Sequence, residues 1–198
     1  MKNQLLAAFC GLVLAANANA QDLTKPYNYT VDLTAAKNDQ LLVELDVPDM
    51  AKAPKTLKFF IPKIVPGTYA IYNYGKFVEG FKAFDKKGKE LKVSHTDPNV
   101  WEIKKSSKLA KITYLVNDSW DADTETQKPL PFEPAGSNIE ADKNFVINTH
   151  CFFGYFEGMT KRPYSVKFKH QPDFFGATAL QRKTSDKESD TFVANKSG

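Results

Sequence analysis

The amino-acid sequence predicts a mainly β or all-β chain, folded as an antiparallel β-sandwich-like domain with one long acidic and proline-rich loop. Three observations support this fold class. Apolar and polar residues alternate along most of the chain, as expected of strands that bury one face. Residues that favour turns separate these alternating runs at short intervals. Outside the first twenty residues, no long segment repeats its apolar residues with the period of about 3.6 that an amphipathic helix requires.

The first three predicted strands lie at 27–33, 40–47 and 56–61. Their sequences are YNYTVDL, QLLVELDV and TLKFFI, and all three are rich in the β-branched, leucine and aromatic residues that strands bury. A turn is expected at Asp49, because aspartate can hydrogen-bond to the backbone of the residues that follow it.

The next three predicted strands follow a proline–glycine turn. Pro66-Gly67 is a strong turn signal, because proline fixes φ at about −65° and glycine accepts a positive φ at the following position. The strands expected after it are 78–85, 90–95 and 100–104, and Lys87-Gly88 marks a turn between the first two.

Two further strands are predicted at 111–116 and 164–170. The second one, YSVKFKH, alternates regularly, so the side chains of Tyr164, Val166 and Phe168 should share one face of a sheet. This regular alternation favours a strand with one buried face and one solvated face.

Three segments break the strand pattern. Residues 118–138 are acidic and then proline-rich, which predicts a long loop of the kind that often carries function. Residues 148–157 (NTHCFFGYFE) are compatible with a short helix or with another strand. Residues 183–198 are polar apart from Phe192-Val193, which predicts a tail or the start of a linker.

The first twenty residues have the features of a signal peptide. Lys2 is followed by the apolar segment Leu5–Ala16 and by Ala18-Asn19-Ala20, a small-residue cleavage site. An N-terminal anchor is the alternative, but this apolar segment is shorter than the roughly 20 residues that span a bilayer. We therefore expect an exported protein, periplasmic or extracellular, that does not stay at the membrane. The domain boundaries predicted are 1–20 for the signal peptide, 21–182 for the β-domain and 183–198 for the tail.

Composition excludes several classes of protein. The formal net charge is +4, and Lys2 of the signal peptide contributes one of these charges. A protein this weakly basic is not expected to bind nucleic acid. Cys10 would be removed with the signal peptide, which leaves Cys151 without a disulfide partner. The fold must then depend on a hydrophobic core, and Cys151, within an apolar segment, is predicted to be buried rather than nucleophilic.

No pattern in the sequence predicts catalysis or a metal site. A metallopeptidase helix carries two histidines one helical turn apart. The three histidines of this sequence are too far apart for that spacing, and they are His95, His150 and His170. Glycine-rich phosphate loops and the nucleophile elbow of hydrolases are also missing. Asp121, Asp123 and Glu125 alternate in the manner of Ca²⁺ ligands, but Thr126 stands where an EF-hand loop needs glycine. A solvated acidic loop is the expectation for these acids.

Clusters of aromatic residues are the remaining candidates for a functional site. They cluster at 69–84 and again at 152–156, and the first cluster comprises Tyr69, Tyr72, Tyr74, Phe77, Phe81 and Phe84. Core packing is one interpretation, because aromatic side chains bury large areas. A wall that binds a peptide or a sugar is the other, because exposed tyrosines suit both ligands.

An ordered set of short segments resembles one known family. The segments are Pro62-x-x-x-Pro66-Gly67-Thr68-Tyr69, Phe81–Asp85 with Gly88–Leu91, Trp101 in VWEI, Phe156-Glu157-Gly158 with Pro163, and Pro172 with Gly176–Leu180. In order and spacing they resemble the N-terminal domain of the glycyl aminopeptidase family of metallopeptidases, peptidase family sixty-one. The resemblance extends over residues 27–193.

The resemblance implies a non-catalytic domain of a zinc-dependent aminopeptidase. In that family the zinc lies in a downstream thermolysin-like domain with an HExxH helix, usually followed by a PDZ domain. The expected partners of this chain are therefore a catalytic domain of the same parent protein and a peptide substrate, and this chain itself is expected to hold no cofactor and no catalytic residue. The residues expected to form a peptide-binding wall are Tyr69, Tyr72, Tyr74, Phe153, Tyr155 and Glu157.

A binding module is the alternative function. The excess of aromatic residues without catalytic groups is also compatible with an exported β-sandwich that holds a carbohydrate or another exported protein.

Overall fold

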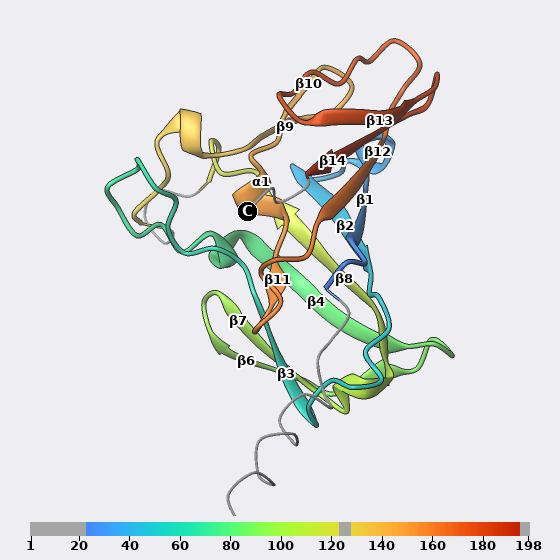
Figure 1. Ribbon diagram of the computed structural model, residues 1–198. Coiled ribbons are helices and arrows are strands. Elements are labelled where there is room, and N and C mark those ends of the chain that lie inside the picture. Colours follow the sequence, from blue (N-terminus) through green and yellow to red (C-terminus); the bar gives the residue numbers. More distant parts are fainter. Residues whose placement is uncertain (1–22, 123–127, 195–198) are drawn as a thin grey trace, which may run out of the picture.

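Two β-sheets face each other in the computed structural model, which describes residues 23–122 and 128–194 (Figure 1). The predicted signal peptide at 1–20 and the acidic residues Asp123 and Glu125 lie outside the described residues. No helix in the described ranges is long and apolar enough to cross a membrane.

The larger sheet has eight strands in the order β13-β14-β12-β1-β2-β8-β4-β5. These strands are β1 (Tyr27–Asp32), β2 (Gln40–Asp46), β4 (Val78–Asp85), β5 (Glu90–Leu91), β8 (Leu109–Asn117), β12 (Tyr164–Lys169), β13 (Gln181–Ser185) and β14 (Ser189–Ala194). Neighbours are antiparallel with one exception, because β1 runs parallel to β12, with Tyr27 opposite Tyr164. The mainly β, sandwich-like fold is confirmed. The parallel pairing of β1 with β12 departs from the antiparallel arrangement that the sequence predicted.

The smaller sheet has four strands in the order β11-β3-β7-β6, and a separate hairpin pairs β9 with β10. The strands are β3 (Thr56–Phe60), β6 (Val93–Asp97), β7 (Val100–Lys104), β9 (Asn138–Glu140), β10 (Asn144–Val146) and β11 (Tyr155–Phe156). One α-helical turn, α1 (Thr149–Phe152), precedes β11. Short 3-10 turns are η1 (Leu33–Ala35), η2 (Tyr74–Phe77), η3 (Ser106–Lys108) and η4 (Glu133–Ala135).

Aromatic side chains fill the space between the two sheets. The ring of Phe59 on β3 lies 5.3 Å from that of Phe156 and 6.2 Å from that of Tyr114 on β8. Phe81 on β4 stacks on Trp101 of β7 at 4.9 Å. These contacts bury the apolar faces of the strands that carry them, so most of the aromatic residues form the core, as the first interpretation of the sequence expected.

Buried tyrosine hydroxyls tie the segment around α1 to the larger sheet. Tyr29 donates a hydrogen bond to the Gly154 carbonyl at 2.8 Å, and Tyr114 donates one to the Phe152 carbonyl. The hydroxyl of Tyr27 accepts the Phe156 N–H at 3.0 Å. Each tyrosine thus satisfies its polar atom within the core, and together they fix the position of α1 and β11.

The structure also differs from the sequence expectations elsewhere. The expected tail begins inside β13, and β13 with β14 forms a hairpin that joins the larger sheet beside β12. The expected strand at 90–95 is divided between β5 and β6, which belong to different sheets. Residues 148–157 contain both alternatives, a helical turn and a short strand.

Candidate functional site

Two adjoining cavities lie beside strands β12 and β14. We call them the His170 cavity, of about 480 Å³, and the Tyr155 cavity, of about 460 Å³, after a residue that lines each. Both are within the range of about 300–1,000 Å³ that small-molecule sites occupy. They share wall residues from α1, from β12, from β14 and from the β12–β13 connection, and the shared residues are Thr149, Phe153, Val166, Leu180 and Phe192.

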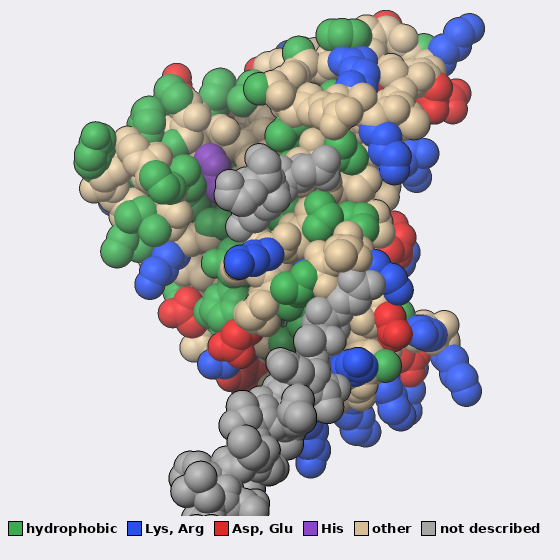
Figure 2. Space-filling view, in the orientation of Figure 1, with side chains coloured by type: hydrophobic (Ala, Val, Ile, Leu, Met, Phe, Trp, Pro, Cys, Tyr) green, Lys and Arg blue, Asp and Glu red, His purple; other side chains and the backbone are tan. Residues whose placement is uncertain are grey.

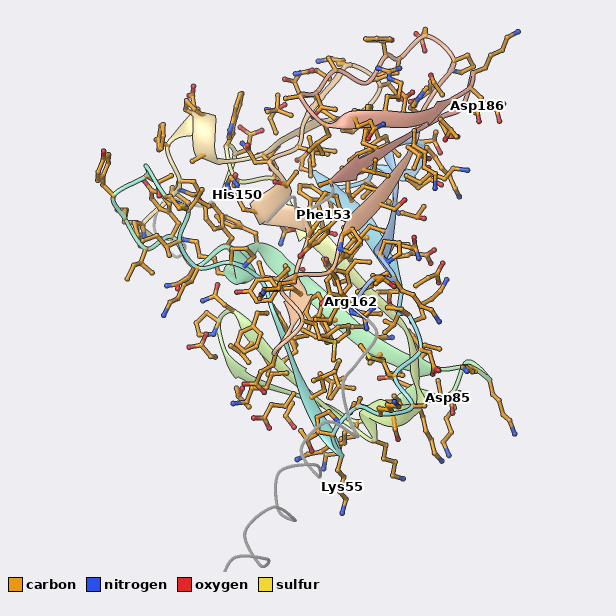
Figure 3. All side chains as sticks on the ribbon, in the orientation of Figure 1. Lys55, Asp85, His150, Phe153, Arg162 and Asp186 are labelled. Carbon is orange, nitrogen blue, oxygen red and sulfur yellow. The ribbon has the colours of Figure 1, made fainter. Side chains whose placement is uncertain are left out.

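Strand register explains why apolar side chains line these cavities. Val166 is paired with Phe192 across β12 and β14, so the two side chains emerge on the same face of the larger sheet. Phe153 follows α1, and its ring lies 6.3 Å from that of Phe168 on β12. Figure 3 labels Phe153 near the centre of the molecule, between α1 and the larger sheet.

A buried polar network forms one wall of the His170 cavity. The carboxylate of Asp190 accepts hydrogen bonds from the Gly176 N–H at 3.1 Å and from the Arg182 guanidinium at 3.0 Å. Its Oδ2 also lies 3.4 Å from Nε2 of His170, and both side chains are buried. Burial alone would raise the pKa of Asp190, but hydrogen bonds from Ser185 and Gly176 and the charge of Arg182 lower it below its ordinary value.

Stability should depend on pH through Asp190. A carboxyl whose pKa is lower in the folded state stabilises the fold above its unfolded pKa, and this contribution is lost as the pH falls through the folded pKa. We expect Asp190→Asn to lower the free energy of unfolding at pH 7 by about 2 kcal/mol. The variant should also lose less stability than the wild type between about pH 5 and pH 2.

Urea denaturation at several pH values measures this difference. Glu157→Gln, at an exposed carboxylate, is the matched control and should retain the wild-type dependence on pH. A wild-type dependence that Asp190→Asn leaves unchanged would contradict this role for Asp190.

The predicted peptide-binding wall is only partly assembled. Phe153 and Tyr155 line the Tyr155 cavity together, as a wall would require. Tyr74 is fully buried and Tyr72 is 8% exposed, so these two belong to the core and cannot form an exposed wall. Glu157 is exposed but lines neither cavity.

Tyr69 instead stands on an exposed loop, with 99% of its surface accessible. Ile64 and Ile71 on the same loop, 61–73, are 47% and 54% exposed, and Phe132 beside η4 is 50% exposed. We call these four residues the apolar surface. Figure 2 shows hydrophobic side chains gathered on the side of the molecule where this loop and the η4 segment project.

Hydrogen bonds hold this loop in one shape. The N–H groups of Tyr72 and Asn73 both donate to the Lys63 carbonyl at 3.0 Å, and the Thr68 N–H donates to the Val65 carbonyl at 3.2 Å. Tyr69 has a φ of 55°, which costs about 1–2 kcal/mol for a residue other than glycine. The loop therefore holds a tyrosine that is both strained and exposed. The signal in the sequence for this surface is the presence of isoleucines in a turn that also contains proline and glycine.

His95, His150 and Cys151 are each engaged in packing or in hydrogen bonds to the backbone. His95 stacks on Trp101 with ring centroids 4.6 Å apart, and Nε2 of His150 lies 2.8 Å from the Ala135 carbonyl. Burial raises the pKa of the Cys151 thiol to about 12, which suits a structural thiol and not a nucleophile. Within 23–122 and 128–194, no three His, Cys, Asp or Glu side chains are grouped to hold a metal ion.

Comparisons with known proteins agree with this architecture. The model of the peptidase M61 N-terminal domain family matches residues 28–197. A crystal structure of an aminopeptidase N family protein from Idiomarina loihiensis is similar in fold, with a TM-score of 0.69 and 20% sequence identity. The match covers 85% of this chain and 27% of that one, so this chain spans about a quarter of that protein's length. A search of curated proteins gave no significant match.

Proposed function

Because the chain belongs to the peptidase M61 N-terminal domain family, which confirms the resemblance of its sequence, we propose that it is the substrate-side domain of an exported zinc aminopeptidase. In this proposal the chain does no chemistry itself. It packs against a zinc-peptidase domain of the same parent protein and contributes part of the wall along which a peptide lies. The zinc ion belongs to the peptidase domain.

The apolar surface is the observation that carries this proposal. Three large apolar side chains on one hydrogen-bonded loop, with Phe132 as the fourth, stay exposed although the chain has a well-filled core. Exposed apolar patches of this kind mark surfaces that bind another protein domain. Rigid aromatic side chains such as Tyr69 lose little conformational entropy on contact, which suits them to anchor an interface.

The cavity beside Tyr155 supports the second part of the proposal. Phe153 and Tyr155 line it together with Pro62, which lies near the start of the loop that bears Tyr69. A domain that covers the apolar surface would therefore lie next to this cavity. A peptide held between the two domains would contact Phe153 and Tyr155.

Replacing Tyr69 with alanine tests the interface. The side chain is fully exposed, so Tyr69→Ala should change the free energy of unfolding by less than about 0.5 kcal/mol. Binding of the purified chain to the separately expressed zinc-peptidase domain of its parent gene should weaken by at least about tenfold, as for an aromatic anchor. Isothermal titration calorimetry measures the binding.

Phe175→Ala is the matched control, because Phe175 is an aromatic residue that is 77% exposed on a different segment. It should bind the peptidase domain as the wild type does. A parent gene without an HExxH domain in frame contradicts the proposal, and stoichiometric glycan binding by the chain would favour the carbohydrate-binding module instead.

A further inference from the structure

The wall of the Tyr155 cavity differs in charge from that of its neighbour. Its apolar part includes the buried side chains of Phe153, Val166 and Phe192, and its rim includes the exposed threonines Thr149 and Thr160. None of its lining residues that the structure describes is Asp, Glu, Lys or Arg, whereas three aspartates line the adjoining His170 cavity. An uncharged apolar group would therefore bury its surface in the Tyr155 cavity without facing a charge.

Two ionisable side chains in this wall are held in their neutral forms. Nε2 of His150 lies 2.8 Å from the Ala135 carbonyl, which can only accept a hydrogen bond, so Nε2 carries a proton. Burial lowers the pKa of His150, so its ring is neutral at pH 7. The Tyr164 hydroxyl donates to the Gly154 carbonyl at 3.2 Å, and burial raises the pKa of Tyr164. A charged side chain that entered this cavity would lose its water and meet no opposite charge, which is costly.

The cavity lies between two points at which the proposed peptidase domain would be attached. Ala194, the last residue of β14, lines the cavity, and the family model ends three residues later at 197. A domain that follows in the same polypeptide therefore begins close to the cavity. Pro62 lines it as well, and the loop that bears Tyr69 starts nearby. A domain joined beyond Ala194 and docked on the apolar surface would leave the cavity facing the cleft between the two domains.

We propose that the Tyr155 cavity is a specificity pocket that holds one large, uncharged apolar side chain of the peptide, such as that of phenylalanine, and excludes charged side chains. Its volume of about 460 Å³ admits such a side chain together with part of the adjoining backbone. The assignment to a peptide substrate rests on the proposed function. The selection of an apolar side chain over a charged one requires only residues of this chain, so it can be measured without the peptidase domain.

Titration of the purified, isotope-labelled chain with blocked amino acids tests this pocket. The probes are the N-acetyl amides of phenylalanine, of lysine and of glutamine, which share one peptide-like backbone and differ in their side chains. We expect saturable NMR shift changes with the phenylalanine probe, centred on residues that line the Tyr155 cavity. It should bind at least about tenfold more tightly than the lysine probe, with the glutamine probe also weaker than phenylalanine.

A charge placed on the rim should reverse the preference. Thr160 is exposed and lines the cavity, so Thr160→Glu adds a carboxylate there without disturbing the core. The variant should bind the lysine probe more tightly and the phenylalanine probe less tightly, so that the ratio of their affinities falls at least about tenfold. Thr184→Glu makes the same change at an exposed threonine of β13 outside both cavity linings, and it should keep the wild-type ratio.

A second pair of variants tests whether the cavity itself is occupied. Ala194→Phe adds a ring to a residue that lines the cavity, and it should weaken binding of the phenylalanine probe at least about tenfold. Val193→Phe adds similar bulk at the preceding residue of β14, whose side chain emerges on the opposite face of the sheet and lines neither cavity. This control should bind the probe as the wild type does.

Shift changes that do not saturate, equal binding of the phenylalanine and lysine probes, or a wild-type affinity ratio in folded Thr160→Glu would each refute the pocket. These results are separate from those of the docking experiment. If the probes bind as expected but the chain does not bind the peptidase domain, the pocket stands and the proposed function fails. If the peptidase domain binds but the phenylalanine probe does not, the docking function stands and the pocket is refuted.

Discussion

Replacing Phe59 with alanine is expected to lower the free energy of unfolding by about 3–5 kcal/mol. Phe59 is fully buried, and its ring contacts both sheets, with Phe81 at 5.4 Å and Tyr114 at 6.2 Å on the larger sheet and Phe156 at 5.3 Å on the smaller one. The truncation would leave a cavity between the sheets that rigid neighbouring rings cannot fill. Both the lost transfer free energy and the empty space contribute to the cost.

The neighbouring residue gives the matched control for this prediction. Phe60 lies on the same strand but faces the other way, is only partly buried, and stacks on Tyr155 with ring centroids 5.7 Å apart. Phe60→Ala should cost less than half as much as Phe59→Ala in urea denaturation followed by circular dichroism. Equal losses for the two variants would contradict the assignment of Phe59 to the contact between the sheets.

Replacing Gly75 with alanine is expected to have the second largest effect, a loss of about 3 kcal/mol. A Cβ atom at this position would collide with the Pro98 carbonyl oxygen and would lie 2.8 Å from Cα of Asn99, and both of these are backbone atoms that cannot swing aside. The Gly75 N–H also donates to Oδ1 of Asn99 at 3.1 Å. This close contact attaches η2, and with it the end of the exposed loop, to the turn between β6 and β7.

Gly75→Ala should therefore affect the interface as well as stability. Because the loop that carries Tyr69 ends at this contact, its displacement should also weaken binding to the zinc-peptidase domain. Gly88→Ala is the control, since Gly88 has a positive φ of 76° but no atom near its missing Cβ, and it should cost only about 1 kcal/mol. Thermal unfolding and calorimetric binding measure the two effects, and a Gly75→Ala variant as stable as Gly88→Ala would refute the steric argument.

The sequence predicted the strands well because most of them bury one face. Alternation placed 78–85 and 100–104 at the observed bounds of β4 and β7, and it placed 27–33 within one residue of β1. The sequence did not predict the hairpin of β13 and β14, because β13 lacks a buried face. Most side chains of its edge strand β13 are exposed, so a solvated strand there has the composition of a polar tail.

The sequence could not distinguish buried from exposed aromatic residues. Tyr69 and Tyr74 belong to one aromatic run, yet one is 99% exposed and the other is fully buried. Burial depends here on backbone turns, since Tyr69 and Asn73 both adopt positive φ values, which alternation does not reveal. The pairing of His170 with Asp190 was also invisible, because it depends on which strand β14 joins and no short motif records that choice.

The parallel pairing of β1 with β12 has a consequence for the order in which the chain folds. Asp32 on the first strand meets Lys169, which lies 137 residues later, so one edge of β1 stays open until β12 has been synthesised. Contacts between such distant residues slow folding, because a long loop must close before they form. We therefore expect a nascent chain that ends before Tyr164 to stay sensitive to proteases, and the larger sheet to close late, around its central parallel pair.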